Sequence, residues 1–99
     1  MTDALPASIG VLVVDDHQLF AAGLARLLAD EPDITVLGIA TSGAQALEMV
    51  DRLQPQVVLT DYLMPDQDGV TVTAQIKARN PTIMVVMLTG SARTRNGAL

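Results

Sequence analysis

Two acidic motifs, each directly after an apolar run, are the residues of this sequence best suited to chemistry. Asp15 and Asp16 follow the run at 9–14, and Asp61 follows the run at 57–60. Because burying a lone charge is costly, carboxylates beside a buried strand normally have a partner or a metal. If the two runs are neighbouring parallel strands, the three carboxylates converge at their carboxyl ends, where open α/β sheets bind ligands.

Such a cluster of carboxylates is typical of phosphoryl transfer assisted by a divalent metal. Mg²⁺ prefers hard oxygen ligands and keeps several waters, so one or two direct carboxylates are enough. An aspartate can itself be the nucleophile and form an aspartyl-phosphate. The charge that develops on the phosphoryl oxygens needs the metal, hydroxyl groups and backbone N–H groups around it. Thr89, which follows a further apolar run, offers such a hydroxyl.

The elements that position these residues alternate along the chain. Short β-branched or apolar runs predict strands, and apolar residues at helical spacing predict helices between them. A proline stands between each helix and the next strand, at Pro32, Pro55 and Pro81. This alternation predicts right-handed βαβ crossovers and an α/β fold with a parallel sheet. The predicted strands are 9–14, 34–40, 57–60 and 83–88, and the predicted helices end at Ala29, Leu53 and Arg79.

The sequence also predicts the caps and faces of these helices. Asp16 is expected to cap the first helix, and Ser42 and Gln45 have capping-box spacing before the second. His17 is expected to be structural or solvated. The side chains expected to form the apolar stripes are Phe20, Leu24, Leu27 and Leu28, then Ala46, Leu47, Val50 and Leu53, then Val72 and Ile76.

Composition bounds the class of protein. The 99 residues suffice for one domain, and the absence of cysteine excludes disulfides and thiolate chemistry. A net charge of −5 with scattered basic residues argues against direct nucleic-acid binding. No signal peptide or membrane-spanning run is present, so we expect a cytoplasmic protein. The expected organisation is a lead-in at 1–8, a domain at 9–91 and an irregular tail at 92–99.

Together, in this order, these motifs resemble the receiver domain, the phospho-acceptor module of bacterial two-component response regulators. The resemblance covers roughly residues 9–91. The Val14–His17 opening is most similar to the branch with a LuxR/NarL-type helix-turn-helix output domain. The residues that carry the resemblance are Asp15-Asp16, Asp61, Met64-Pro65, Asp68-Gly69 and Thr89.

The resemblance implies a CheY-like (flavodoxin-like) doubly wound parallel sheet and a role for each site residue. Asp61 would take a phosphoryl group from the phosphohistidine of a sensor histidine kinase. Asp16, Asp61 and the backbone carbonyl of Leu63 would ligate Mg²⁺, and Asp15 would act largely through a metal-bound water. Thr89 would hydrogen-bond a phosphoryl oxygen and report phosphorylation. The family is a signalling switch with self-catalysed transfer and hydrolysis rather than an enzyme with a metabolic substrate.

The sequence departs from the family after Thr89. A complete receiver continues with a fourth helix, a fifth strand that begins with a lysine, and a fifth helix, and we find none of these. Lys77 lies in the third helix and is not that lysine. We therefore expect a truncated receiver with strand order 2-1-3-4, an apolar edge at 83–88, and an exposed apolar patch beside the first helix.

Those exposed surfaces predict association through a dimer joined along the fourth strand, an exchange of elements, or a partner chain. Two alternatives to the phospho-accepting switch remain open. One is a receiver-like scaffold or dimerisation module that does not depend on phosphorylation. The other is a small aspartate-nucleophile phosphatase, although the adjacent Asp15-Asp16 pair does not match the spaced aspartates of such enzymes.

Overall fold

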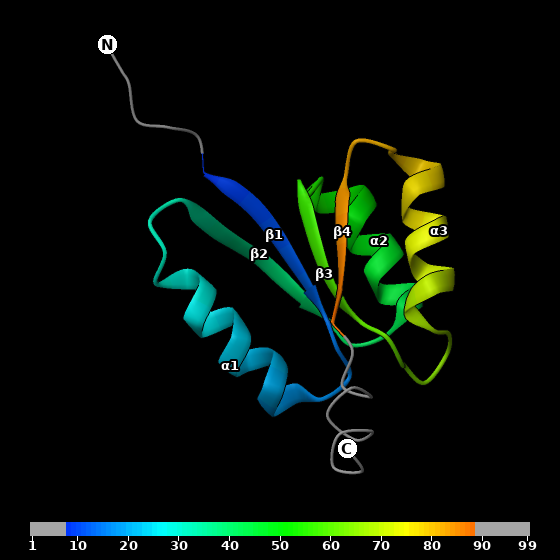
Figure 1. Cartoon of the computed structure of the whole chain (residues 1–99), viewed down its shortest axis with the longest axis horizontal. Helices are drawn as coiled ribbons and strands as arrows, with labels where there is room; N and C mark the ends of the chain where they lie inside the picture. Colours follow the sequence, from blue (N-terminus) through cyan, green and yellow to red (C-terminus); the bar gives the residue numbers. More distant parts are fainter. Residues whose placement is uncertain (1–7, 89–99) are drawn as a thin grey trace, which may run out of the picture.

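The computed structural model describes residues 8–88, which form one parallel sheet covered by helices on both faces (Figure 1). The strands are β1 (Ile9–Val14), β2 (Ile34–Ala40), β3 (Val57–Asp61) and β4 (Met84–Leu88). Their order is β2-β1-β3-β4, and every pairing is parallel. The predicted doubly wound sheet with order 2-1-3-4 is therefore confirmed. The predicted tail and the lead-in, apart from Ser8, lie outside the described residues.

The three helices divide unequally between the two faces of the sheet. They are α1 (Gln18–Ala29), α2 (Gly43–Leu53) and α3 (Gly69–Arg79). Figure 1 shows α2 and α3 together on one face and, among residues 8–88, α1 by itself on the other. The described part of the chain contains no helix that is long and apolar enough to cross a membrane.

The larger part of the core lies under α2 and α3. Val72 and Ile76 are fully buried there, as predicted, against Leu12 and Val58 of the central strands. Each buried aliphatic side chain of this size contributes about 1.5–3 kcal/mol relative to exposure. This face therefore anchors the sheet from which the candidate site projects. Its other buried members are Val14, Ala40, Ala46, Met49, Val50 and Ile83.

The core under α1 is smaller than the core under α2 and α3. Ala21 is fully buried, and Leu24 and Leu28 pack against Val11 and Val13 of β1. In contrast, Phe20 is 52% exposed and Leu27 is 69% exposed, so the exposed apolar patch predicted beside the first helix is confirmed. The helical spacing was correct, but α1 packs mainly over β1 and β2. Part of its apolar stripe therefore extends beyond its packing partners.

Candidate functional site

The register of the two central strands brings the acidic motifs together. Val14 at the end of β1 pairs with Thr60 of β3, so the next residues, Asp15 and Asp61, leave the sheet side by side. Potential ligand atoms of Asp15, Asp16, His17 and Asp61 all lie within 4.8 Å of one another. The predicted convergence of the three carboxylates is therefore confirmed, whereas their roles remain predictions.

His17 belongs to this cluster, although the sequence indicated only a structural or solvated residue. Its Nδ1 lies 2.8 Å from Asp15 Oδ1, 3.3 Å from Asp16 Oδ1 and 3.7 Å from Asp61 Oδ2. The hydrogen bond to Asp15, and then the charge of Asp16, raise the pKa of His17 above its usual value. The sequence Asp15-Asp16-His17 was the one signal that could have placed His17 in the cluster. Whether the ring reaches the carboxylates depends on the turn of the chain before α1, which the sequence does not show.

Asp16 does not cap α1, which corrects the sequence prediction. His17 occupies the N-cap position of α1, and its side chain makes no capping hydrogen bond. Instead, Asp15 Oδ1 accepts both the backbone N–H of His17, at 2.8 Å, and the ring nitrogen of the same residue. The side chain of Asp16 is thereby left at the carboxylate cluster.

The electrostatics of Asp61 follow from its crowded position. Its side chain is only 14% exposed. Burial, followed by the negative charge of Asp15, raises the pKa of Asp61, because both disfavour the ionised form. The backbone N–H of Tyr62 donates to Asp61 Oδ1 at 2.8 Å and opposes that shift. An ionised Asp61 therefore favours a nearby cation.

The chemistry of the cluster fits a hard divalent cation such as Mg²⁺. Its carboxylate oxygens are the type of ligand that Mg²⁺ takes in proteins. Asp16 Oδ1 is buried and makes no hydrogen bond, although His17 Nδ1 lies 3.3 Å away. A buried carboxylate oxygen without a hydrogen bond is costly, and a bound cation would satisfy it. Leu63, whose carbonyl was predicted as a ligand, lies in the loop after β3, and Thr89 lies outside the described residues.

The loop after β3 is closed by contacts that hold Asp61 in place. Gly69 donates its N–H to the carbonyl of Tyr62 at 2.5 Å. A Cβ at Gly69 would lie 2.7 Å from the backbone oxygen of Asp61, so the close approach of the chain requires glycine here. Asp68 caps α3 by accepting the N–H of Thr71 at 2.7 Å. The Asp68-Gly69 pair thus has the turn and capping role that its residue types indicate.

Asp66 connects the same loop to the start of α2. Its two carboxylate oxygens accept the N–H groups of Gly43 and Ala44, at 2.9 and 3.0 Å. Ser42 accepts the N–H of Gln45 as predicted, although Gln45 bonds back to the N–H of Thr41 rather than to that of Ser42. The first turn of α2 is therefore capped largely by a residue more than twenty positions later, which sequence patterns do not reveal.

Comparison with known proteins identifies the family. Residues 11–98 match the family described as the response regulator receiver domain. The chain belongs to this receiver family. It is 46% identical over 81 residues to the response regulator protein VraR of Staphylococcus saprophyticus, covering 82% of this chain and 39% of VraR. The receiver therefore spans about two fifths of the length of such curated relatives.

Solved receiver structures share its fold. The signal receiver domain of NarL from Mycobacterium tuberculosis has a TM-score of 0.78 and 36% identity, over 85% of this chain and 68% of that one. The isolated receiver domain of RcsB from Salmonella enterica, determined with a phosphomimetic, has a TM-score of 0.77 and 26% identity. The match covers 83% of this chain and 62% of that chain. Another structure contains RcsB dimers bound to DNA and has a TM-score of 0.76 and 26% identity. The match covers 83% of this chain and 44% of that chain.

The cap formed by Asp66 predicts a pH-dependent contribution to stability. Hydrogen bonds from Gly43 and then Ala44 lower the pKa of Asp66 below its ordinary value of 3.8. A carboxyl group whose pKa is lower in the folded protein than in the unfolded chain stabilises the fold at pH values above the pKa of the unfolded chain. This stabilisation is lost as the pH falls through the pKa of the folded protein. We expect Asp66→Asn to lower the urea midpoint at pH 7, with a difference from the parent that narrows below about pH 3.8.

The matched control is Asp33→Asn, because the side chain of Asp33 is exposed and makes no hydrogen bond within residues 8–88. Circular dichroism across a pH series measures both variants. A constant difference between Asp66→Asn and the parent down to the lowest pH, or an equal effect of Asp33→Asn, contradicts the capping role.

Proposed function

We propose that this chain is a phospho-accepting signalling switch, in which Asp61 takes a phosphoryl group from the phosphohistidine of a sensor histidine kinase. The observation that carries the proposal is the register of β1 and β3, which sets Asp15 and Asp61 side by side at the carboxyl edge of the sheet. Membership of the receiver family supports the same chemistry. The switch would have no metabolic substrate.

The contacts of Asp61 distinguish its two oxygens. Oδ1 accepts the N–H of Tyr62, whereas Oδ2 faces the cluster. One oxygen of Asp61 would attack phosphorus, forming an O–P bond as the P–N bond to the kinase histidine breaks and its electron pair returns to the imidazole, while the other oxygen would remain on Mg²⁺. The loop contacts through Gly69 and Asp68 hold the strand end in place for this attack.

The remaining site residues have proposed roles in the same step. Asp16, Asp61 and the Leu63 carbonyl would hold Mg²⁺ directly, and Asp15 would hold it largely through water. Bound Mg²⁺ supplies positive charge that offsets the charge of the phosphoryl oxygens. Thr89 would donate its hydroxyl to one of those oxygens.

The test of this proposal is the intact mass of the protein after incubation with Mg²⁺ and acetyl phosphate. We expect one added phosphoryl group on the parent and none on Asp61→Asn, which keeps the side-chain shape but removes the nucleophile. Asp51→Asn is the matched control, because its exposed carboxylate lies on α2 and pairs with Arg79 away from the site. A parent without the added mass, or an Asp61→Asn variant that gains it equally, overturns the assignment.

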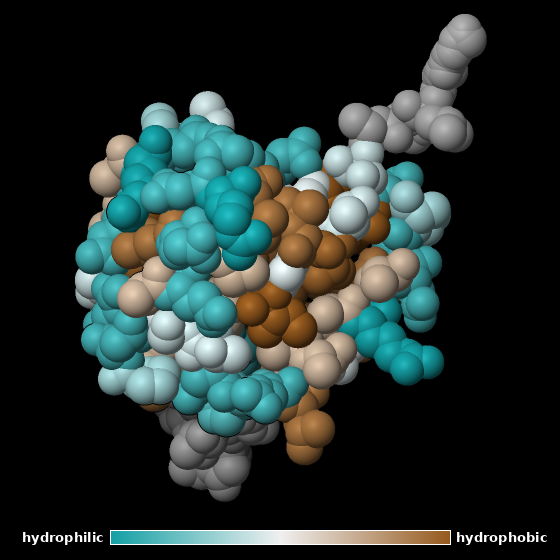
Figure 2. Space-filling model, turned by 180° about the vertical axis from the view of Figure 1, so that it is seen from behind, coloured by the Kyte–Doolittle hydropathy of each residue, from teal (hydrophilic) through white to brown (hydrophobic). Residues whose placement is uncertain are grey.

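A second candidate function is a dimerisation module, and a specific surface favours it. β4 is the edge strand of the described sheet and exposes Met84 and Val86, which are 60% and 38% accessible. An unpaired apolar edge strand is a template for pairing with another chain. Figure 2 shows a broad band of apolar side chains across one face of the molecule.

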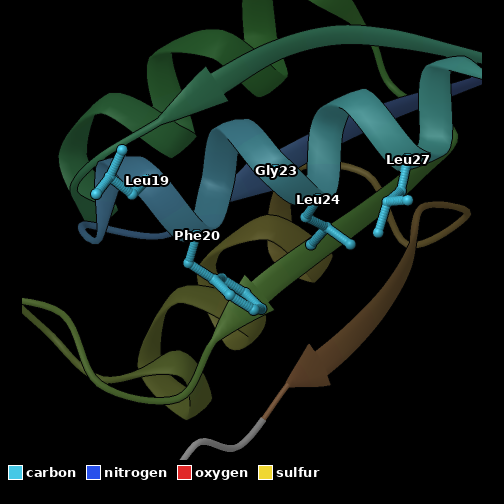
Figure 3. Close-up of a pocket in the computed structure, with 5 residues that line it drawn as sticks. All are labelled: Leu19, Phe20, Gly23, Leu24 and Leu27. Atoms are coloured by element: carbon cyan, nitrogen blue, oxygen red, sulfur yellow. The ribbon is translucent and has the colours of Figure 1, made fainter.

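The neighbouring groove on α1 adds to this apolar surface. It has a volume of about 460 Å³. In Figure 3, Phe20, Leu24 and Leu27 project from α1 toward the side on which β3 lies, whereas Leu19 points elsewhere. We propose a second copy of this chain as the partner, with two β4 edges paired antiparallel about a two-fold axis. The solved structure that contains RcsB dimers bound to DNA shows that a protein with a similar receiver fold dimerises.

If the chain dimerises through β4, a charge introduced on that strand should weaken the dimer. We expect sedimentation equilibrium to give a concentration-dependent dimer for the parent, and Val86→Lys to weaken association at least about tenfold, because it places a charge on the edge. Val70→Lys is the control, since Val70 is 56% exposed on α3 and away from β4. A monomeric parent at all concentrations, or equal weakening by both variants, contradicts the interface.

A further inference from the structure

The ring of His17 lies where the carboxylates of the cluster point. Its Nδ1 is within 3.7 Å of one oxygen from each of Asp15, Asp16 and Asp61. Asp15 Oδ1 accepts the backbone N–H of His17, and the ring Nδ1 lies 2.8 Å from the same oxygen. A ring nitrogen that faces three carboxylates in this way occupies the space toward which their oxygens point.

A cation bound by the same oxygens would need nearly the same space. Mg²⁺ lies about 2.0–2.1 Å from its oxygen ligands and demands near-octahedral geometry. Oxygens that lie within 4.8 Å of one another can share such an ion only near the centre of the cluster. The Nδ1 atom of His17 already lies in this region, and its ring fills the space that the ion would need. The ring in this position and the bound ion therefore exclude each other.

We propose that His17 is an internal competitor for the divalent cation: its imidazole occupies the carboxylate cluster in the metal-free receiver and turns out to solvent when Mg²⁺ binds. His17 thereby sets the Mg²⁺ affinity of the site and with it the concentration range in which phosphorylation proceeds. This inference rests on the proposed phospho-accepting function and adds an affinity-determining residue to it.

The surroundings of His17 allow the ring to leave without disturbing the turn. Its side chain is 69% exposed, and within the described residues its polar partners are the carboxylates of the cluster. The backbone N–H of His17 makes its own bond to Asp15 Oδ1, so the main chain stays anchored when the ring moves. The side chain also makes no cap for α1, whose first turn does not depend on it.

The test compares Mg²⁺ affinities by isothermal titration calorimetry for the parent, His17→Ala and Gln18→Ala. A net hydrogen bond is worth about 0.5–1.5 kcal/mol, so removing the competitor should tighten Mg²⁺ binding about two- to tenfold. Gln18→Ala is the matched control, because it truncates the neighbouring exposed side chain at the start of α1 and leaves the ring in place. Its affinity should equal that of the parent.

A second readout follows the ring directly. The chain has one histidine, so its imidazole resonances in a proton NMR spectrum need no assignment by mutation. Saturating Mg²⁺ should remove nuclear Overhauser contacts between this ring and the β-protons of Asp15 and Asp61. Retention of these contacts in the Mg²⁺-bound protein overturns the proposal.

The outcomes separate this inference from the function on which it rests. If parent and His17→Ala bind Mg²⁺ equally, His17 is not a competitor, although the phospho-accepting function stands. Weaker binding by His17→Ala makes the ring a ligand or a support of the site, which also overturns the proposal. If neither protein binds Mg²⁺, both the competitor and the metal-dependent function are wrong.

Discussion

The repulsion among three carboxylates held at one edge of the sheet is the constraint on which the candidate site depends. Parallel pairing of β1 and β3 fixes Asp15 beside Asp61, and the turn before α1 adds Asp16. Burial, followed by the like charge of Asp15, raises the pKa of Asp61, because both disfavour its ionised form. The site is thereby prepared for positive charge, whether from the His17 ring or from a divalent cation.

The rest of the described structure maintains this arrangement against the repulsion. The core under α2 and α3 anchors the central strands, and the Gly69 contact closes the loop that leaves Asp61. Asp66 ties that loop to α2, so the strand end, the loop and two helices form one connected unit. A change in charge at Asp61 therefore acts on a structure that already links it to α2 and α3, which is the coupling that the proposed phosphorylation switch needs.

Periodicity and punctuation in the sequence predicted the parallel sheet, the helices and the convergence of Asp15, Asp16 and Asp61, whereas the strand order came from the resemblance to receiver domains. These features depend on local apolar patterns and on the rule that parallel strands end at one edge. The cap from Asp66 to α2 was not predictable, because it joins residues far apart in the sequence. The prediction that Asp16 caps α1 was wrong because the turn before α1, rather than residue type, decides where that side chain points. The same turn brings His17 to the cluster. Phe20 and Leu27 show a limit of periodicity, which locates a helix but does not reveal how much sheet that helix covers.

The most direct test of the central claim is urea unfolding of the parent and Asp61→Asn, each with and without Mg²⁺. Removing one carboxylate should relieve the repulsion, so Asp61→Asn should be the more stable protein without Mg²⁺. Mg²⁺ at about one hundred times its Kd should stabilise the parent by about 2.7 kcal/mol and the variant much less. A variant that is less stable without Mg²⁺, together with equal effects of Mg²⁺ on both proteins, would contradict a cation site built on carboxylate repulsion.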